Sequence, residues 1–166
     1  AMVDGLVGSE MCIRDRAKEA IEAGAAMIND ISAFELDKEM INTLSIYKVP
    51  YVLMHMQGTP QNMQKNPYYK NVVKDIIQFL DNKISKLKTF GIHDIVIDPG
   101  FGFGKTLSHN YQLLNHLDKF QSLGHPILVG ASRKSMIQKP INVQAENALN
   151  GTCLLYTSDA ADERHC

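Results

Sequence analysis

The chain has 166 residues, of which 45% are hydrophobic and 21% are charged, so its composition is that of an ordinary globular domain. A net charge of -1 provides no basic face for nucleic acid and no single-sign block for a membrane surface. No apolar run approaches the roughly 18 residues of a spanning helix, and no signal-like stretch opens the chain, so we expect a cytoplasmic protein with small-molecule partners.

The two ends of the chain differ from its middle. The three cysteines, Cys12, Cys153 and Cys166, all lie near the termini. Residues 6–16 and 153–163 resemble translated adapters of shotgun sequencing libraries, with a natural frayed terminus as the alternative. We therefore expect residues 1–16 and 153–166 to be extraneous and disordered, and a partial barrel domain to occupy residues 17–152.

Between these ends, short apolar runs alternate with longer amphipathic stretches, which is typical of βαβ units and a parallel sheet. The runs are nearly continuous in apolar residues, as expected for strands covered on both faces. The expected strands are residues 26–31, 51–55, 95–98 and 127–130. The expected helices are residues 17–23, 36–47 and 69–90, one capped by Ser108, and one beginning at Val143.

About four such units make half of a barrel or most of a small doubly wound sheet, and the pattern alone does not decide between them. In either architecture ligands bind where loops leave the carboxyl ends of the strands. Polar residues gather at those positions: Asn29 and Asp30, His55 and Gln57, Asp98, and Ser132 to Ser135.

The third strand runs into a loop with three alternating glycines, Gly100, Gly102 and Gly104. A P-loop is excluded because Pro99 stands where its first glycine is required, and Lys105 likewise breaks the dinucleotide-binding pattern. We interpret Asp98 as an acceptor for two N–H groups of a flat heterocycle, which is planar and bidentate recognition. The alternative is a strand-end aspartate that caps its own loop.

Three further positions are candidates. Asn29 both donates and accepts, so it suits the mixed edge of a pterin or purine ring, although a turn residue is the alternative. His55 is interpreted as a structural histidine. In residues 130–135 two cations at a loop-to-helix junction favour a negatively charged ligand group, with a solvated basic turn as the alternative.

Together, these segments resemble the dihydropteroate synthase family. The resemblance is carried by residues 25–31, 53–58, 98–105 with 108–111, and 130–137, and it covers nearly all of residues 17–152. It implies a (β/α)8 barrel, here partial, that joins p-aminobenzoate to a dihydropterin methyl pyrophosphate and releases pyrophosphate with the help of Mg²⁺.

The same resemblance implies the roles of individual residues. Asp98 and Lys134 would hold the electrophile as catalytic residues, and with Asn29 they would grip the pterin. The other positions would line the two substrate pockets: Met54 and Gly130 for the pterin, Phe103 and Ser135 for p-aminobenzoate.

The resemblance also implies parts that this chain does not contain. The family's first three strands, which would supply the Mg²⁺ ligands, and its eighth strand have no counterpart, so we expect the chain alone to be inactive and its parent to be an active homodimer. Two other interpretations remain open. One is a methyltetrahydrofolate-binding methyltransferase module on the same barrel, and the other is an assembly product without function.

Overall fold

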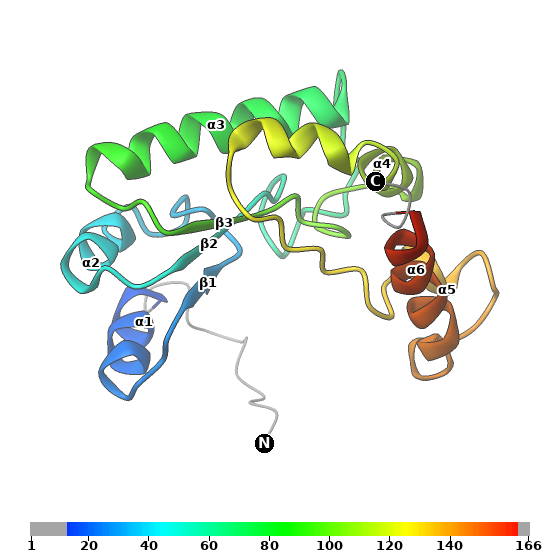
Figure 1. Ribbon diagram of the computed structural model, residues 1–166, viewed down its shortest axis with the longest axis horizontal. Coiled ribbons are helices and arrows are strands. Elements are labelled where there is room, and N and C mark those ends of the chain that lie inside the picture. The colour runs from blue at the N-terminus through cyan, green and yellow to red at the C-terminus, as the bar shows by residue number, and fades with distance from the viewer. Residues whose placement is uncertain (1–12, 163–166) are drawn as a thin grey trace.

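The structure is a computed structural model, and it describes residues 13–162 (Figure 1). Three short strands alternate with helices, and a group of helices follows the third strand. In chain order the elements are α1 (Ile13–Glu22), β1 (Ile28–Asp30), α2 (Met40–Tyr47), β2 (Tyr51–Met54), α3 (Val72–Thr89), β3 (Ile95–Asp98), α4 (Leu107–Leu114), η1 (Leu117–Leu123), α5 (Ser135–Gln138), η2 (Ala145–Asn147) and α6 (Leu149–Asp162).

The three strands form a parallel sheet in the order β1-β2-β3, which confirms the predicted α/β class. Each strand therefore lies beside the next one in the chain. Figure 1 shows α1, α2 and α3 in an arc around one side of this sheet, at the left and top of the view. Helices α4, α5 and α6 form a group at the right of the view. Sequential order with the connecting helices on one side is the arrangement of a (β/α)8 barrel segment, and one half of a doubly wound sheet shares it.

The register of the sheet separates its two faces. Ile28, Tyr51 and Ile95 form one row across the strands, and Asn29, Val52 and Val96 form the next. Successive side chains of a strand point to opposite faces, so the two rows face opposite ways. The face of the first row carries the apolar core, which Ile28, Tyr51, Leu53, Ile95 and Ile97 share with residues of the helices. The other face carries Asn29, Met54 and Asp98.

The predicted fourth strand, residues 127–130, is wrong as a regular strand. A single bridge joins Ile97 to Ile127, with hydrogen bonds from Ile97 N–H to the Pro126 carbonyl (2.9 Å) and from Leu128 N–H to the Ile97 carbonyl (2.8 Å). Beyond it, the Val129 carbonyl accepts from the Tyr156 hydroxyl instead, at 3.0 Å. In the part of the chain that the structure describes, no strand flanks this segment on its other side, so its ladder does not extend.

Several predicted helix starts also differ, among them that of α3, which begins at Val72 instead of residue 69. The helix expected from residue 36 begins at Met40, because Asp37 binds the residues directly before it: its Oδ1 accepts the Glu39 N–H at 3.0 Å and its carbonyl accepts the Met40 N–H at 3.1 Å. Thr106, rather than Ser108, caps α4, and it forms a capping box with His109. At Val143 the backbone is still non-helical, and α6 begins at Leu149.

The structure describes helical backbone near both ends of the chain, in residues 13–16 and 153–162. Helix α1 begins at Ile13, and α6 continues to Asp162. Ile13 and Leu155 are partly buried against the core, which gives both helical extensions an apolar contact. Residues 1–12 and 163–166 lie outside the described residues. None of the described helices is both long enough and apolar enough to cross a membrane.

A buried hydrogen bond between β1 and β2 supplies a test of this packing. The Tyr51 hydroxyl donates to Asp30 Oδ2 at 2.8 Å, and burial together with the nearby carboxylate raises the pKa of Tyr51 well above its ordinary value. Removing the donor in Tyr51→Phe should lower the free energy of unfolding by about 1.5 to 3 kcal/mol, the range for hydrogen bonds to charged groups. Urea denaturation measures this change.

Tyr47→Phe is the matched control, since its hydroxyl donates to Glu22 at 2.6 Å on the exposed surface. We expect no measurable change in that variant. Equal effects of the two substitutions would contradict a special role for the buried bond.

Candidate functional site

The candidate site lies on the face of the sheet opposite the core, at the carboxyl ends of the strands. Met54 is in register with Asp98, and both lie two residues beyond the row that contains Asn29. The side chains of Asn29, Met54 and Asp98 therefore project from the same face. Asp98 and Met54 are buried, whereas Asn29 is exposed.

Asp30, the neighbour of Asn29, points to the other face and has a structural role. Its carboxylate accepts from the Ser32 N–H and hydroxyl, the Phe34 N–H and the Tyr51 hydroxyl, at 2.7 to 2.8 Å. These four donors leave little capacity for a ligand.

The loop that follows β3, residues 99–106, is termed the glycine loop. Gly100, Gly102 and Gly104 all have positive φ, of 72°, 81° and 61°, which glycine adopts without strain. A Cβ at Gly100 would lie 1.9 Å from the His55 carbonyl oxygen, and one at Gly104 would lie 2.6 Å from that of Gln57. The loop therefore packs directly against the backbone that leaves β2.

Asp98 lies at the base of this loop. Its Oδ1 accepts the Gly100 N–H at 2.7 Å, so the carboxylate does cap its own loop, as the alternative interpretation holds. Burial raises the pKa of Asp98, while the Gly100 N–H and the cations of Lys134 and Lys105 oppose the rise. The cap occupies only part of the carboxylate's capacity, because two oxygens accept about four hydrogen bonds.

Lys105 is a site residue that the sequence analysis did not single out. It is only 4% exposed. Its Nζ lies 2.9 Å from the carbonyl oxygens of Gly100 and Phe103, 3.3 Å from the His55 carbonyl and 3.0 Å from His55 Nδ1. Burial lowers its pKa to about 7, with Asp98 opposing the change and Lys134 adding to it.

His55 is buried at the end of β2, and its ring packs edge-on against Phe79 with a centroid separation of 4.9 Å. Burial and the Lys105 cation lower the pKa of His55 to about 3, so its imidazole is neutral near pH 7. A neutral ring that faces an ammonium through Nδ1 accepts there, which places the ring proton on Nε2. This supports the structural interpretation of His55.

Lys134 reaches the glycine loop from the segment before α5. Its ammonium donates to the Phe101 carbonyl and lies 4.7 Å from the centre of the Phe103 ring. Gly130 adjoins it, since a Cβ there would lie 3.7 Å from Lys134 Nζ. Burial lowers the pKa of Lys134, and Asp98 opposes the change.

A cleft of about 670 Å³ opens beside this cluster, and Asn29 and Phe103 both line it. Its other walls come mainly from α1 and β1 and from residues 60–63. Phe103 therefore connects the cleft to the Lys134 and Asp98 cluster.

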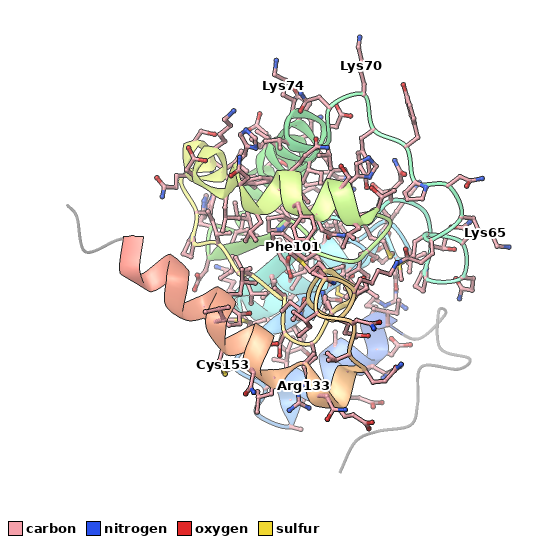
Figure 2. All side chains as sticks on the ribbon, turned by 90° about the vertical axis from the view of Figure 1, so that its right-hand side faces the viewer. Lys65, Lys70, Lys74, Phe101, Arg133 and Cys153 are labelled. Atoms are coloured by element: carbon pink, nitrogen blue, oxygen red, sulfur yellow. The ribbon has the colours of Figure 1, made fainter. Side chains whose placement is uncertain are left out.

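The structure places the remaining predicted residues less centrally. Ser135 begins α5 with an exposed side chain, and Arg133 is exposed as well. Figure 2 shows Arg133 at the lower edge of the molecule, well away from the central, fully buried Phe101.

The segment between β2 and α3, residues 55–71, covers the glycine loop from the other side. Gln64 Nε2 donates to the Gly102 carbonyl at 2.6 Å, and the Tyr69 hydroxyl donates to the Gly104 carbonyl at 2.8 Å. The sequence analysis identified neither as a site residue: Gln64 lies in an irregular stretch without periodicity, and Tyr69 was expected to begin a helix that in fact begins at Val72.

No group of three or more His, Cys, Asp or Glu side chains that could hold a metal ion occurs within residues 13–162. The described residues therefore do not fit a magnesium site by themselves.

Comparison with known proteins identifies the family. The family of pterin binding enzymes matches residues 14–162. Dihydropteroate synthase of Clostridium beijerinckii is 44% identical over 138 residues, which cover 82% of this chain and 49% of that protein. The chain belongs to the pterin-binding enzyme family, and it spans about half the length of the curated relatives it matches.

Solved structures agree with this assignment. Dihydropteroate synthase from Thermus thermophilus in complex with 4-aminobenzoate matches with a TM-score of 0.81 and 35% identity, over 86% of this chain and 59% of that one. The same enzyme in complex with 6HMPPP gives a TM-score of 0.82 at 35% identity, over 86% and 57%. These matches confirm that the fold is part of the barrel of dihydropteroate synthases.

The close approach of Gly100 to the end of β2 yields a prediction. In Gly100→Ala the new methyl group would meet the His55 carbonyl at a backbone φ of 72°, so the free energy of unfolding should fall by about 3 kcal/mol or more. Gly124→Ala is the control, because its φ is 69° but nothing lies within 4 Å of its Cβ position.

The control variant carries only the conformational cost of a left-handed alanine, about 1 to 2 kcal/mol. Thermal and urea unfolding of both variants measure the difference. Equal decreases in the free energy of unfolding of the two variants would contradict the prediction, because the glycine loop would then move away from His55 without a free-energy cost.

The pKa of Lys105 yields a second prediction. Since that pKa falls from 10.5 to about 7 on folding, the unfolded chain binds more protons between these two values. The free energy of unfolding, relative to a Lys105→Met variant, should therefore rise with pH from about 7 to 10.5 and stay level below about 7. Urea denaturation across this range measures it, and a difference that does not vary with pH would show that Lys105 is not desolvated.

Proposed function

We propose that this chain carries the central pterin-binding part of a dihydropteroate synthase. The whole protein would join p-aminobenzoate to 6-hydroxymethyl-7,8-dihydropterin pyrophosphate and give 7,8-dihydropteroate. The observation that carries the proposal is the buried carboxylate of Asp98, on the same sheet face as Asn29 and Met54 and beside the ammonium of Lys134.

These residues suit an amino-pyrimidinone ring. Asp98 retains capacity to accept N–H groups from the edge of the ring, since the Gly100 N–H occupies one position on one oxygen. Asn29 complements a mixed donor and acceptor edge, while the buried Met54 lines the slot. Charge-assisted bonds of this kind are stronger than neutral ones, and burial excludes the competing water.

Lys134 would hold the pterin and its reacting carbon, and Phe103 would border the pocket for p-aminobenzoate. In the proposed reaction the aryl amine nitrogen bonds to the pterin methylene carbon. The carbon–oxygen bond to pyrophosphate breaks, its electron pair leaves with pyrophosphate, and the amine releases a proton. The chain's contribution is to hold the pterin in a fixed position and to supply positive charge near developing negative charge.

The net charge of the cluster supports an anionic ligand. Below about pH 7 Lys105 is protonated, so Lys105 and Lys134 then contribute two positive charges against the one negative charge of ionised Asp98, while His55 stays neutral. Lys134 is only partly buried and its ammonium lies beside Gly130, so it is the more accessible cation for an anionic ligand.

Several properties belong to the proposed whole protein. Its Mg²⁺ ligands would come from segments that correspond to the part of the relatives this chain does not span. We further propose a cytoplasmic homodimer that acts on small molecules and not on nucleic acid or membranes, and that is a target of sulfonamides. Because the chain spans about half of its relatives, we expect it to bind the pterin without catalysing the condensation.

Calorimetric titration with a dihydropterin pyrophosphate tests the proposal. In Asp98→Asn the ring edge meets an amide that donates where a carboxylate accepts, so affinity should fall by about 10- to 100-fold. Since the pKa of Asp98 is raised, wild-type affinity should also weaken as the pH falls toward that raised pKa, because protonation removes the same acceptor.

Asp94→Asn is the matched control, since Asp94 is exposed just before the opposite end of the same strand. Its affinity should equal that of the wild type. Unchanged affinity in Asp98→Asn would overturn the role of Asp98. Condensation of p-aminobenzoate by the chain alone would overturn the proposal that this chain binds the pterin without catalysing the reaction.

A further inference from the structure

Lys105 is a buried cation that the proposed chemistry does not use. It lies directly after the last glycine of the glycine loop and is only 4% exposed. An ammonium with so little access to water is unfavourable unless protein groups replace its hydration. The groups that contact the Lys105 ammonium therefore indicate its structural role.

The partners of Lys105 are all acceptors, and they come from two segments. Its Nζ contacts the carbonyl oxygens of Gly100 and Phe103 at 2.9 Å each, within its own loop. It also contacts Nδ1 and the carbonyl oxygen of His55, at 3.0 and 3.3 Å, at the end of β2. Four acceptors surround three N–H groups, so the ammonium joins the two ends of the loop to the neighbouring strand.

Lys105 and Lys134 bind the same stretch of the glycine loop, residues 100–103. The Phe101 carbonyl, which accepts from Lys134, lies between the two carbonyls that Lys105 fixes. The ring under the Lys134 ammonium belongs to Phe103, whose own carbonyl is bound to Lys105. A change at Lys105 would therefore reach Lys134 through the backbone of the loop.

We propose that Lys105 is a positioning residue: its buried ammonium holds the glycine loop against β2 and so places Phe103 and Lys134 to receive the ligand beside Asp98. This inference rests on the proposed function for its ligand, although its structural part can be tested without any ligand. Lys105 acts through other residues.

The charges around Lys105 are consistent with this role. The titratable groups that face it are His55 from β2, Asp98 from β3, Lys134 from the segment before α5, His109 from α4, and Tyr69, whose ring packs against both histidines. Asp98 is the acid in this group that favours the charged lysine, and both histidines have a lowered pKa, so neither adds a competing charge near pH 7.

Chemical replacement of the side chain tests the charge at constant length. Lys105→Cys is made in a chain whose three cysteines are changed to serine, and the unfolded protein is alkylated and refolded. Treatment with 2-bromoethylamine gives a side chain as long as lysine with a terminal ammonium, and 1-bromopropane gives one of equal length without charge. The measurements are made near pH 5, well below the pKa of about 7 for Lys105, because the thioether sulfur makes the aminoethyl amine less basic than that of lysine. The serine background with its native Lys105 is refolded in parallel.

Two readouts separate positioning from general stability. Circular dichroism reports whether each protein folds, and amide NMR signals of Gly100, Gly102 and Gly104 report the loop. The aminoethyl protein should keep the native loop signals. The propyl protein should fold with the same circular dichroism but with displaced or broadened loop signals, and its affinity for a dihydropterin pyrophosphate should be about tenfold weaker.

A propyl protein with native loop signals and affinity within about twofold of the aminoethyl protein would overturn the proposal. A propyl protein that does not fold would also overturn it, because Lys105 would then be a general requirement of the core. If no form binds the pterin, the proposed function fails alone, and the NMR signals still decide whether Lys105 positions the loop.

Discussion

The close packing of the glycine loop against the end of β2 is the constraint on which the site depends. The His55 carbonyl oxygen lies 1.9 Å from the position that a Cβ of Gly100 would take, and the Gln57 carbonyl oxygen lies 2.6 Å from that of Gly104. Only glycine allows this approach, and the approach brings the Gly100 and Phe103 carbonyls and His55 around one ammonium. Asp98, at the start of the loop, and Lys134, bound to its middle, derive their positions from the same packing.

Burial determines the electrostatic character of this cluster. It raises the pKa of Asp98 and lowers those of Lys105, Lys134 and His55, so each group is shifted toward its neutral form. The opposite charges of Asp98 and the two lysines counter these shifts. A ligand that brings hydrogen-bond donors to the carboxylate and negative charge to Lys134 would favour the ionised forms of both.

Much of this arrangement could be predicted from the sequence. Continuous apolar runs identified the three strands, and Asp98 and Lys134 stood out because they end a strand and begin a helix. The start of α2 was not predicted, because Asp37, inside the apolar pattern, binds the Glu39 and Met40 N–H groups and ends the irregular stretch only at Met40. Lys105 escaped notice because a lysine is ordinarily exposed, and its burial depends on the glycines beside it and on a histidine fifty residues away. The fourth strand failed because pairing depends on neighbours as well as on propensity.

The alternation of Asn29 and Asp30 has a consequence for how this barrel segment can vary. A shift of β1 by one residue would turn the Asp30 carboxylate to the sheet face that carries Asp98 and bury the Asn29 amide against the helices. The four donors that bind Asp30, one of them on β2, oppose that shift. Asp30 thus fixes the register of β1 against β2. A substitution at Asn29, on the site face of β1, can therefore alter ligand preference while the strand alignment persists.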